Sequence, residues 1–327
     1  MKKNTRNRLI DLRSVIKNYM GMATALALLL VIFGLSTENF FTLTTFRTIA
    51  NQIPAITIIA VGMTYVLIIA GIDLSVGSVM ALAGAVLGVC LVNFSFPLPI
   101  AMAACLAVGI LCGAINGFIT VRWKLPSFIV TLGMLEIARG AAYSVTNSRT
   151  MYIGDTVAVI TETEIMGLSL PFIIAIAIVI IAQLILSRTV FGRYIVAIGT
   201  NEETVRLSGI EPGPIKLGVF VTCGFLAALA AIMHTAKLSS ANPNAGYGME
   251  LQAIAAVVIG GTSLMGGRGS VVSTFFGALI IAVLGAGLAQ MGAQEPTKRI
   301  ITGCVIVAAV ILDYYRRRFT RFEILSP

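Results

Sequence analysis

The feature that most constrains this chain is a series of ten apolar stretches joined by mostly short polar connections. A helix needs about 20 apolar residues to cross the hydrocarbon core of a bilayer. Because backbone polar groups must be paired within lipid, each stretch is predicted to form a transmembrane helix. The sequence therefore predicts an all-α polytopic bundle of about ten spans. The stretches cover 20–37, 47–70, 75–93, 97–121, 126–146, 168–187, 214–236, 248–264, 270–290 and 297–315.

The composition agrees with a membrane-embedded chain. Of the 327 residues, 57% are hydrophobic and 11% are charged, whereas soluble domains carry about 25% charged residues. These values exclude a soluble globular enzyme, a disordered chain and a fibrous protein. A basic segment precedes the first stretch, but no small-residue cleavage pattern follows it, so we expect a retained span and not a signal peptide.

The basic residues predict the orientation of the bundle. With the N-terminus in the cytoplasm, 17 Lys and Arg residues fall on the inner side, and five fall on the outer side. Cytoplasmic loops carry such an excess, so both termini are predicted to be cytoplasmic. The net charge of +9 is therefore interpreted as a signal of membrane orientation, and we expect no nucleic-acid partner. We expect a basic cytoplasmic segment at 1–19, one membrane domain at 20–315 and a basic cytoplasmic tail at 316–327.

Patterns of catalysis and metal binding are not found in the sequence. It contains no HExxH, GxSxG or Walker A motif. The five cysteines lie in apolar stretches, and His234 is the only histidine, which disfavours a disulfide framework or metal site. We predict no catalytic residue and no metal site in this chain.

The inner connection at 188–213 is predicted to contain a short helix. Asn201 can cap its N-terminus, Glu202 and Glu203 suit its first turn, and Gly209 suits its end. This helix is too polar to span the membrane. It is either a solvated connector or a docking surface for a cytoplasmic partner.

Two glycine-rich connections carry polar residues next to predicted spans. The first, at 71–78, contains Asp73 and Ser75, and its counterpart at 260–269 contains Thr262 and Ser263. Similar apolar segments at 55–62 and 253–260 precede them, as in a weak internal repeat. Each connection is either a tight cytoplasmic turn, with Asp73 capping the following span, or a break that exposes backbone polar groups to a pathway.

Polar residues within predicted spans are further candidates, because polar groups are costly in a membrane. Glu136 and Arg139 share a helix face and are predicted to form an ion pair, which either fixes helix packing or lines a pathway. Asn116 lies on a stripe of glycines spaced four residues apart, where it bonds either a neighbouring helix or a ligand. Asn51 and Gln52 are candidates for lining a pore.

Several motifs in the same order resemble the membrane permeases of ribose-type sugar ABC importers. They are Gly-Ile-Asp-Leu-Ser-Val-Gly-Ser at 71–78, the 201–209 stretch, and Glu-Leu-Gln-Ala-Ile-Ala-Ala-Val-Val-Ile-Gly-Gly-Thr-Ser at 250–263. The shorter motifs Phe-Gly-Arg at 191–193, Leu-Ser-Ser-Ala at 238–241 and Gly-Gly-Arg-Gly at 266–269 fit as well. The resemblance extends over about 39–314. Permeases for galactose, arabinose, allose and autoinducer-2 are relatives in this family.

The resemblance implies a type II-like permease in the bacterial inner membrane, with defined partners. These are a second copy of the chain, a cytoplasmic sugar-importer ATPase that binds ATP and Mg²⁺, a periplasmic sugar-binding protein and membrane lipid. This chain itself would bind no cofactor. The coupling segment to the ATPase would comprise Gly199, Asn201, Glu202, Glu203, Arg206, Leu207 and Gly209. Candidate pathway or gate residues are Asn51, Gln52, Asp73, Ser75, Asn116, Thr262 and Ser263.

The function that the resemblance implies is ATP-driven import of a neutral monosaccharide, ribose or a related sugar. The scarcity of unpaired charges in the spans fits a neutral solute and argues against a proton-coupled carrier with acidic relays. The alternatives are a stand-alone secondary transporter of a small polar solute and a membrane scaffold without transport activity.

Overall fold

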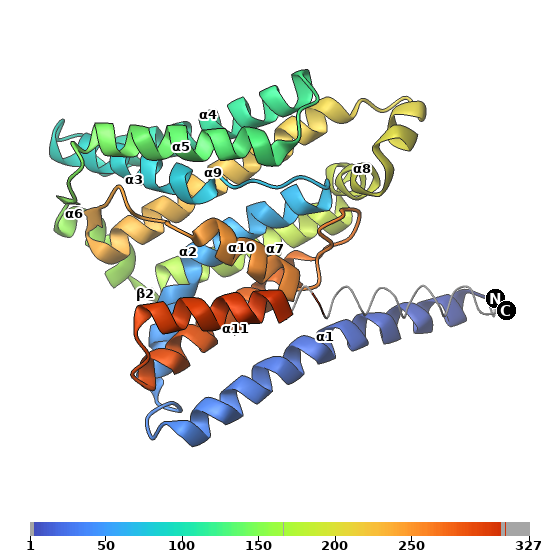
Figure 1. Ribbon diagram of the computed structural model, residues 1–327, viewed down its shortest axis with the longest axis horizontal. Helices are drawn as coiled ribbons and strands as arrows, with labels where there is room; N and C mark the ends of the chain where they lie inside the picture. The colour runs from blue at the N-terminus through green and yellow to red at the C-terminus, as the bar shows by residue number, and fades with distance from the viewer. Residues whose placement is uncertain (1–2, 166, 309–310, 312–327) are drawn as a thin grey trace.

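The computed structural model describes residues 3–165, 167–308 and 311, and the side chains from residue 20 onward. The end of the last apolar stretch and the 316–327 tail lie outside the described residues. The described part is mostly helical, and its helices lie side by side in an elongated bundle with two ends (Figure 1). The helices are α1 (Lys3–Ser36), α2 (Leu43–Ile68), α3 (Val76–Val92), α4 (Leu98–Arg122), α5 (Ser127–Val145), α6 (Asp155–Glu162), α7 (Leu170–Arg188), α8 (Val190–Leu207), α9 (Pro212–Leu238), α10 (Met249–Ile259) and α11 (Val271–Gln290), followed by a helical segment at 295–308.

Six of these helices are long and apolar enough to cross a membrane, namely α2, α4, α5, α7, α9 and α11. The segment Met20–Ser36, α3 and α10 are apolar but shorter. At about 1.5 Å per residue, α3 and α10 extend roughly 26 and 17 Å, less than the ~30 Å hydrocarbon core. Both adjoin a glycine-rich connection that shortens them. The count of ten spans therefore stays a prediction, as does the cytoplasmic position of both termini.

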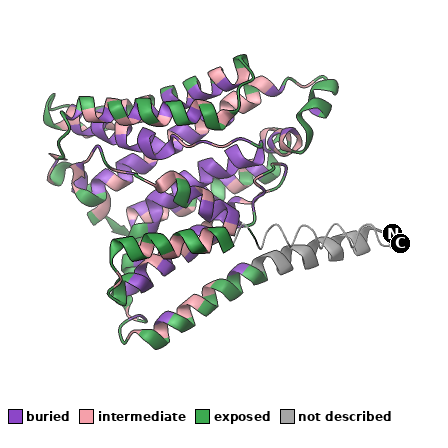
Figure 2. Ribbon diagram, in the orientation of Figure 1, coloured by how far each residue is buried: buried purple, intermediate pink, exposed green. Residues whose placement is uncertain are grey.

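The centre of the bundle is formed by α2 and α9, which pack against α3, α4 and α11 (Figure 2). The most apolar window of α2 is 89% buried, whereas that of α5 is 22% buried. Close packing of α4 on α9 depends on glycine, because a Cβ at Gly113 or Gly224 would overlap the backbone of the facing helix. The predicted glycine stripe is thus confirmed as a packing face. The exposed apolar faces of α4, α5 and α7 suit contact with lipid.

Short strands join the segments at one end of the bundle. Strand β1 (Met151–Tyr152) pairs antiparallel with β4 (Ser240–Ala241), and β2 (Glu164–Ile165) pairs with β3 (Leu168–Ser169). Helix α6 and the start of α2 lie at this end, which we call the outer end. Helix α8 and the start of α1 lie together at the opposite end, which we call the inner end (Figure 1). The two names follow the orientation predicted from the basic residues.

Candidate functional site

Helix α8 consists of two helical segments joined by a kink at Asn201. The Asn201 backbone is extended (φ −162°, ψ 100°), and its side-chain oxygen accepts a 2.9 Å hydrogen bond from the Thr204 N–H. The second segment ends before Gly209, whose φ is +80°, a conformation that glycine adopts without strain. The short capped helix predicted from the sequence is confirmed.

The surface of this short helix is charged and solvent-exposed. Arg206 forms an ion pair with Glu203 and donates a hydrogen bond to its carboxylate. This hydrogen bond lowers the pKa of the Glu203 carboxyl below its ordinary value. Glu202 pairs with Lys216 of α9 at 3.0 Å. Leu207 is 79% exposed, so an apolar side chain extends from a charged surface at the end of the bundle. Such a combination is typical of the rim and anchor of a docking surface.

The kink in α8 contacts the inner end of α2 and the 260–269 connection. Gly199 lies so close to the Ile68 carbonyl that a Cβ would overlap it. The Gly267 N–H donates a 2.8 Å hydrogen bond to the same Ile68 oxygen. Gly267 also packs against Thr200, where a Cβ would come within 2.7 Å of the hydroxyl. Three segments that are distant in sequence therefore meet where the short helix joins the bundle.

A buried hydrogen-bonded chain links the connection before α3 to α4. The Asn116 amide donates to the Ser75 hydroxyl at 2.9 Å, and this hydroxyl donates to Asp73 Oδ1 at 2.6 Å. The same Asp73 oxygen accepts from the Ser75 N–H at 2.9 Å. Each of the three residues is 1% exposed. The structure thus joins three predicted site residues, and Asn116 bonds a neighbouring segment as one interpretation expected.

The segment 71–75 is not an exposed turn, since most of its residues are buried. Hydroxyl groups of α5 satisfy its backbone instead. The Ile72 N–H donates to Ser127 Oγ at 2.9 Å, the Leu74 N–H donates to Thr131 Oγ1 at 3.1 Å, and Thr131 donates to the Ile72 carbonyl at 3.2 Å. Sequence reasoning missed Ser127 and Thr131, although their polar side chains at the start of a predicted span were a usable signal.

A third residue that sequence reasoning missed is Gln183 of α7. Its side-chain oxygen accepts hydrogen bonds from the Val271 and Val272 N–H groups at 2.8 and 3.3 Å. These N–H groups belong to the first turn of α11 and have no partner within the helix. Gln183 therefore stabilises the start of α11, as the α5 hydroxyls stabilise the connection before α3. A lone glutamine within the apolar stretch at 168–187 was the signal.

The connection at 260–269 closes on itself. The Ser263 N–H donates to the Arg268 carbonyl at 3.0 Å, and the Gly266 N–H donates to the Ser263 carbonyl at 3.1 Å. Thr262 is fully buried, and its hydroxyl has no hydrogen-bond partner among the described residues. In the described part of the chain no hydrogen bond joins the Thr262 hydroxyl to the Asp73 chain.

The predicted ion pair between Glu136 and Arg139 is not formed. Glu136 is exposed, while one Arg139 guanidinium nitrogen donates to the carbonyls of Pro243 and Ala245 at 2.6 and 2.8 Å. The guanidinium also lies 6.0 Å from the centre of the Tyr247 ring. The prediction considered only partners on the same helix face. In the fold the outer 239–248 segment lies against α5 and its carbonyls accept hydrogen bonds from Arg139 instead, so the prediction was wrong.

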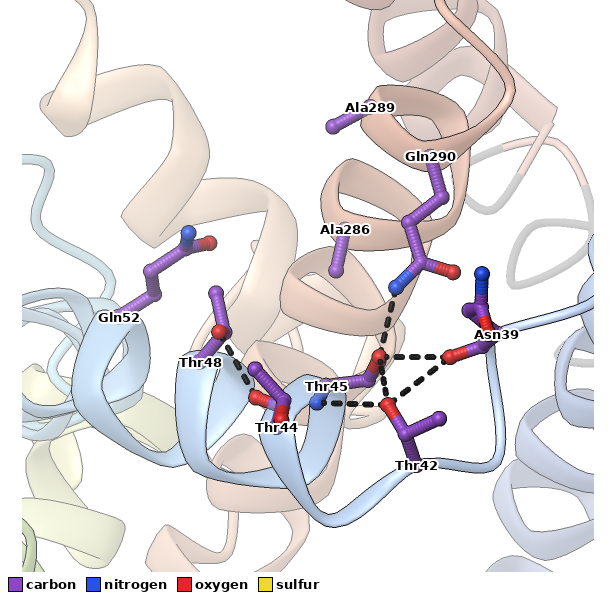
Figure 3. Close-up of a pocket in the computed structure, with 9 residues that line it drawn as sticks. All are labelled: Asn39, Thr42, Thr44, Thr45, Thr48, Gln52, Ala286, Ala289 and Gln290. Atoms are coloured by element: carbon purple, nitrogen blue, oxygen red, sulfur yellow. Dashed lines mark hydrogen bonds between the residues drawn. The ribbon is translucent and has the colours of Figure 1, made fainter.

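Asn51 and Gln52 face two different hollows at the outer end. The larger hollow, which we call the outer hollow, has a volume of about 500 Å³ and lies between the start of α2 and the end of α11 (Figure 3). Asn51 faces a smaller space of about 110 Å³ beside Arg47 and Glu164. The outer hollow is lined by Asn39, Thr42, Thr44, Thr45, Thr48, Gln52, Ala286, Ala289 and Gln290.

Comparison with known proteins identifies the family to which this chain belongs. The family model described as "Branched-chain amino acid transport system / permease component" matches residues 45–310. The chain belongs to this permease family. The match covers both glycine-rich connections, α8 and most of the outer hollow. It also fits the apolar helices, and it identifies a multi-pass protein of the bacterial inner membrane.

Curated relatives of the permease include several sugar import permeases. The chain is 42% identical to the ribose import permease RbsC of Haemophilus influenzae, over 89% of this chain and 91% of that protein. It is 36% identical to the D-allose transport system permease AlsC of Escherichia coli, over 90% of both chains. It is 33% identical to the fructose import permease FrcC of Rhizobium meliloti, over 90% of this chain and 84% of that protein. The permease therefore belongs with sugar-importing ABC permeases.

Proposed function

We propose that this permease is the membrane subunit of an ATP-driven importer of a neutral monosaccharide, ribose or a closely related sugar. The observation that carries the proposal is the 42% identity to ribose permeases over almost the whole chain. Identity to the fructose and allose permeases is 33% and 36%, and identity to the ribose permease of Bacillus subtilis is 35%. The nine residues that line the outer hollow include no charged side chain, which suits a neutral solute.

The proposed complex contains a cytoplasmic ATPase, a periplasmic sugar-binding protein and a second copy of this chain. The short helix after Asn201 is the proposed docking element for the ATPase, with Leu207 as an apolar anchor and Glu203 and Arg206 at the rim. ATP and Mg²⁺ are bound by the ATPase. The sugar-binding protein docks at the opposite, outer end, where β1 to β4 and the outer hollow lie.

Transport then follows from coupling between states. ATP binding moves the ATPase surface against the α8 helix, and the contacts of Gly199 transmit this movement to the inner end of α2. The pathway alternates between open states, and each ligand shifts the equilibrium only by its difference in affinity for the two states. The breaks at 71–78 and 260–269, with Asp73, Ser75, Asn116, Thr262 and Ser263, are the proposed gate elements.

The test is reconstitution of the permease with its ATPase and sugar-binding protein in proteoliposomes, with sugar-loaded binding protein outside and ATP accessible to the ATPase. We expect radiolabelled ribose to accumulate, and vanadate and omission of the ATPase each to abolish accumulation. Uptake that proceeds without the ATPase would instead identify a secondary transporter. Absence of uptake of ribose, allose and fructose with all partners present would identify a scaffold. Competition by each unlabelled sugar ranks the substrates.

A further inference from the structure

We infer that the outer hollow is a binding site for the neutral sugar on the permease itself, made by the start of α2 and the end of α11. The inference rests on the proposed function and adds the location and chemistry of a sugar contact. Figure 3 shows that the side chains come from both helices and from the connection before α2.

Exposed polar groups occupy one face of the outer part of α2. Thr44, Thr48 and Gln52 are spaced four residues apart, so they lie along one helix face, and all three are exposed. The helix is almost fully buried from Ile53 to Ile68. A row of exposed hydroxyl and amide groups at the border of the membrane is unfavourable against lipid. This face is therefore expected to contact water and a polar solute.

The lining of the hollow has the chemistry of a sugar-binding surface. It combines hydroxyl and amide side chains, which both donate and accept hydrogen bonds, with the methyl groups of Ala286 and Ala289. A monosaccharide presents the same combination, since its hydroxyls donate and accept and its ring carbons are apolar. A zwitterionic amino acid or a sugar phosphate would find no opposite charge among the lining residues. The volume of about 500 Å³ lies within the usual range of small-molecule sites.

One wall of the hollow is held by hydrogen bonds between side chains, while two other lining side chains have no such partner among the described residues. The Gln290 amide nitrogen donates to Thr45 Oγ1 at 2.6 Å, and the Thr45 and Thr42 hydroxyls lie 3.0 Å apart. The side-chain amide of Gln52, at the far end of the row on α2, has no hydrogen bond in the part of the chain that the structure describes. The Asn39 side-chain amide has none either, and it lies beside the held wall, where the Asn39 backbone carbonyl accepts from the Thr42 and Thr45 hydroxyls. Both amides are therefore available to bond a sugar.

The position of the hollow also connects sugar contact to coupling. Helix α2 carries Thr48 and Gln52 at its outer part and ends at Ile68, whose carbonyl contacts Gly199 and Gly267 at the inner end. One continuous helix therefore reaches from the sugar site to the joint beside the short α8 helix. A change at either end can alter the position of the other through this helix, which contains Pro54.

The first experiment uses near-isosteric variants in the reconstituted importer. Thr48→Val and Gln52→Leu remove hydrogen-bonding groups with little change in shape, and each is expected to lower the rate of ribose uptake at subsaturating loaded binding protein about three- to tenfold. Thr163→Val is the matched control, because Thr163 is exposed near the outer end but does not line the hollow. Thr163→Val should match the wild type in ribose uptake, in co-purification with the ATPase and in basal ATP hydrolysis. Thr48→Val and Gln52→Leu should still co-purify with the ATPase, because the hollow lies at the end of the bundle opposite to the short α8 helix.

The second experiment measures occupancy of the hollow directly. Four cysteines are buried and Cys304 is exposed, so Cys304→Ser provides a background for Thr48→Cys and the control Thr163→Cys. A membrane-impermeant thiosulfonate is added outside with ribose-loaded or ribose-free binding protein. When the ribose concentration at the site is twice its dissociation constant, labelling of the cysteine at position 48 should slow about threefold. Labelling at position 163 should not respond to ribose.

The outcomes separate the two proposals. If the wild-type importer takes up no ribose, the proposed function fails. If it takes up ribose while Thr48→Val and Gln52→Leu match the wild type, the hollow is not a sugar site. Equal protection by loaded and ribose-free binding protein would show shielding by the docked protein alone, and would also overturn the inference.

Discussion

Gly199 in α8 lies directly against the backbone carbonyl of Ile68, the last residue of α2. The contact leaves no space for a side chain, and the Gly267 N–H donates to the same carbonyl oxygen. The absence of a Cβ at residue 199 therefore allows the proposed docking helix to rest on the two segments that continue into the breaks. Glycine here serves close approach between backbones, since its φ is not positive.

The Gly199→Ala substitution should weaken coupling more than it weakens folding. A methyl group at this position forces α8 away from Ile68, and overpacking of this kind typically costs about 1–3 kcal/mol. We expect ATP hydrolysis by the assembled complex to respond less to loaded binding protein, and ribose uptake per ATP to fall. Gly218→Ala is the control, because its Cβ would meet only the Phe191 ring at 3.5 Å. Unchanged uptake per ATP in Gly199→Ala would show that this contact does not transmit movement.

Exchanging the charges of Glu203 and Arg206 tests the docking surface. The double variant Glu203→Arg, Arg206→Glu keeps an ion pair within the helix but inverts the charges that a partner meets. An exposed pair of this kind contributes little to stability, so the melting temperature should stay within a few degrees. Co-purification of the ATPase should be lost.

Leu207→Ala separates the contribution of the apolar anchor from that of the charges. Leu207 is 79% exposed in the permease, so truncating it should not destabilise the chain. We expect weaker co-purification of the ATPase, with a Kd increase of about tenfold if Leu207 is a buried anchor in the complex. A fully assembled complex with both the double variant and Leu207→Ala would place the docking surface elsewhere.

Asp73 should be needed as a hydrogen-bond acceptor. Asp73→Ala leaves the Ser75 N–H and hydroxyl without their acceptor, and each unsatisfied buried donor costs about 1–3 kcal/mol. Asp73→Asn keeps an acceptor oxygen in the same place and should melt closer to the wild type. Thermal unfolding in detergent measures both variants. Equal destabilisation by the two substitutions would show that the carboxyl group itself, and not only its acceptor oxygen, is required.

Arg139 should hold the outer 239–248 segment against α5. Arg139→Ala removes the hydrogen bonds to Pro243 and Ala245, so we expect faster proteolysis of this segment from the outer side. Arg139→Lys should protect the segment better than Arg139→Ala does, but less well than the wild type, because a lysine ammonium lacks the planar geometry of a guanidinium. Glu136→Gln should change nothing, because Glu136 is exposed and unpaired with Arg139. An equal effect of Glu136→Gln and Arg139→Ala would support the ion pair that the structure does not contain.

Features determined by neighbouring residues could be predicted from the sequence. The N-cap by Asn201 and the helix end at Gly209 depend on residues within one short segment, and both are as predicted. The glycine stripe of α4 is likewise a local pattern with a fixed spacing. The span count was harder to predict, because hydropathy does not show that α3 and α10 are shortened by buried connections.

Features that depend on distant segments could not be read from one sequence. Arg139 donates hydrogen bonds to backbone carbonyls more than a hundred residues away. Every residue has such a carbonyl, so the sequence does not show which ones Arg139 will meet. Asn116 meets Ser75 across a separation of 41 residues. The sequence indicated Gln52 as a pore-lining candidate, and Gln52 lines the outer hollow. The second wall of the hollow comes from α11 and could not be assigned without the fold.

The α5 hydroxyls that bond the backbone before α3 restrict which helices can move apart. If α5 slid away from the 71–75 segment, the N–H groups of Ile72 and Leu74 would lose their acceptors in a mostly buried segment, and each unsatisfied buried donor costs about 1–3 kcal/mol. Asn116 binds α4 to the same segment, and glycine contacts bind α4 to α9. Helices α3, α4, α5 and α9 are therefore expected to shift as one rigid block. Any hinge would then lie at the boundary between that block and the helices on its other side.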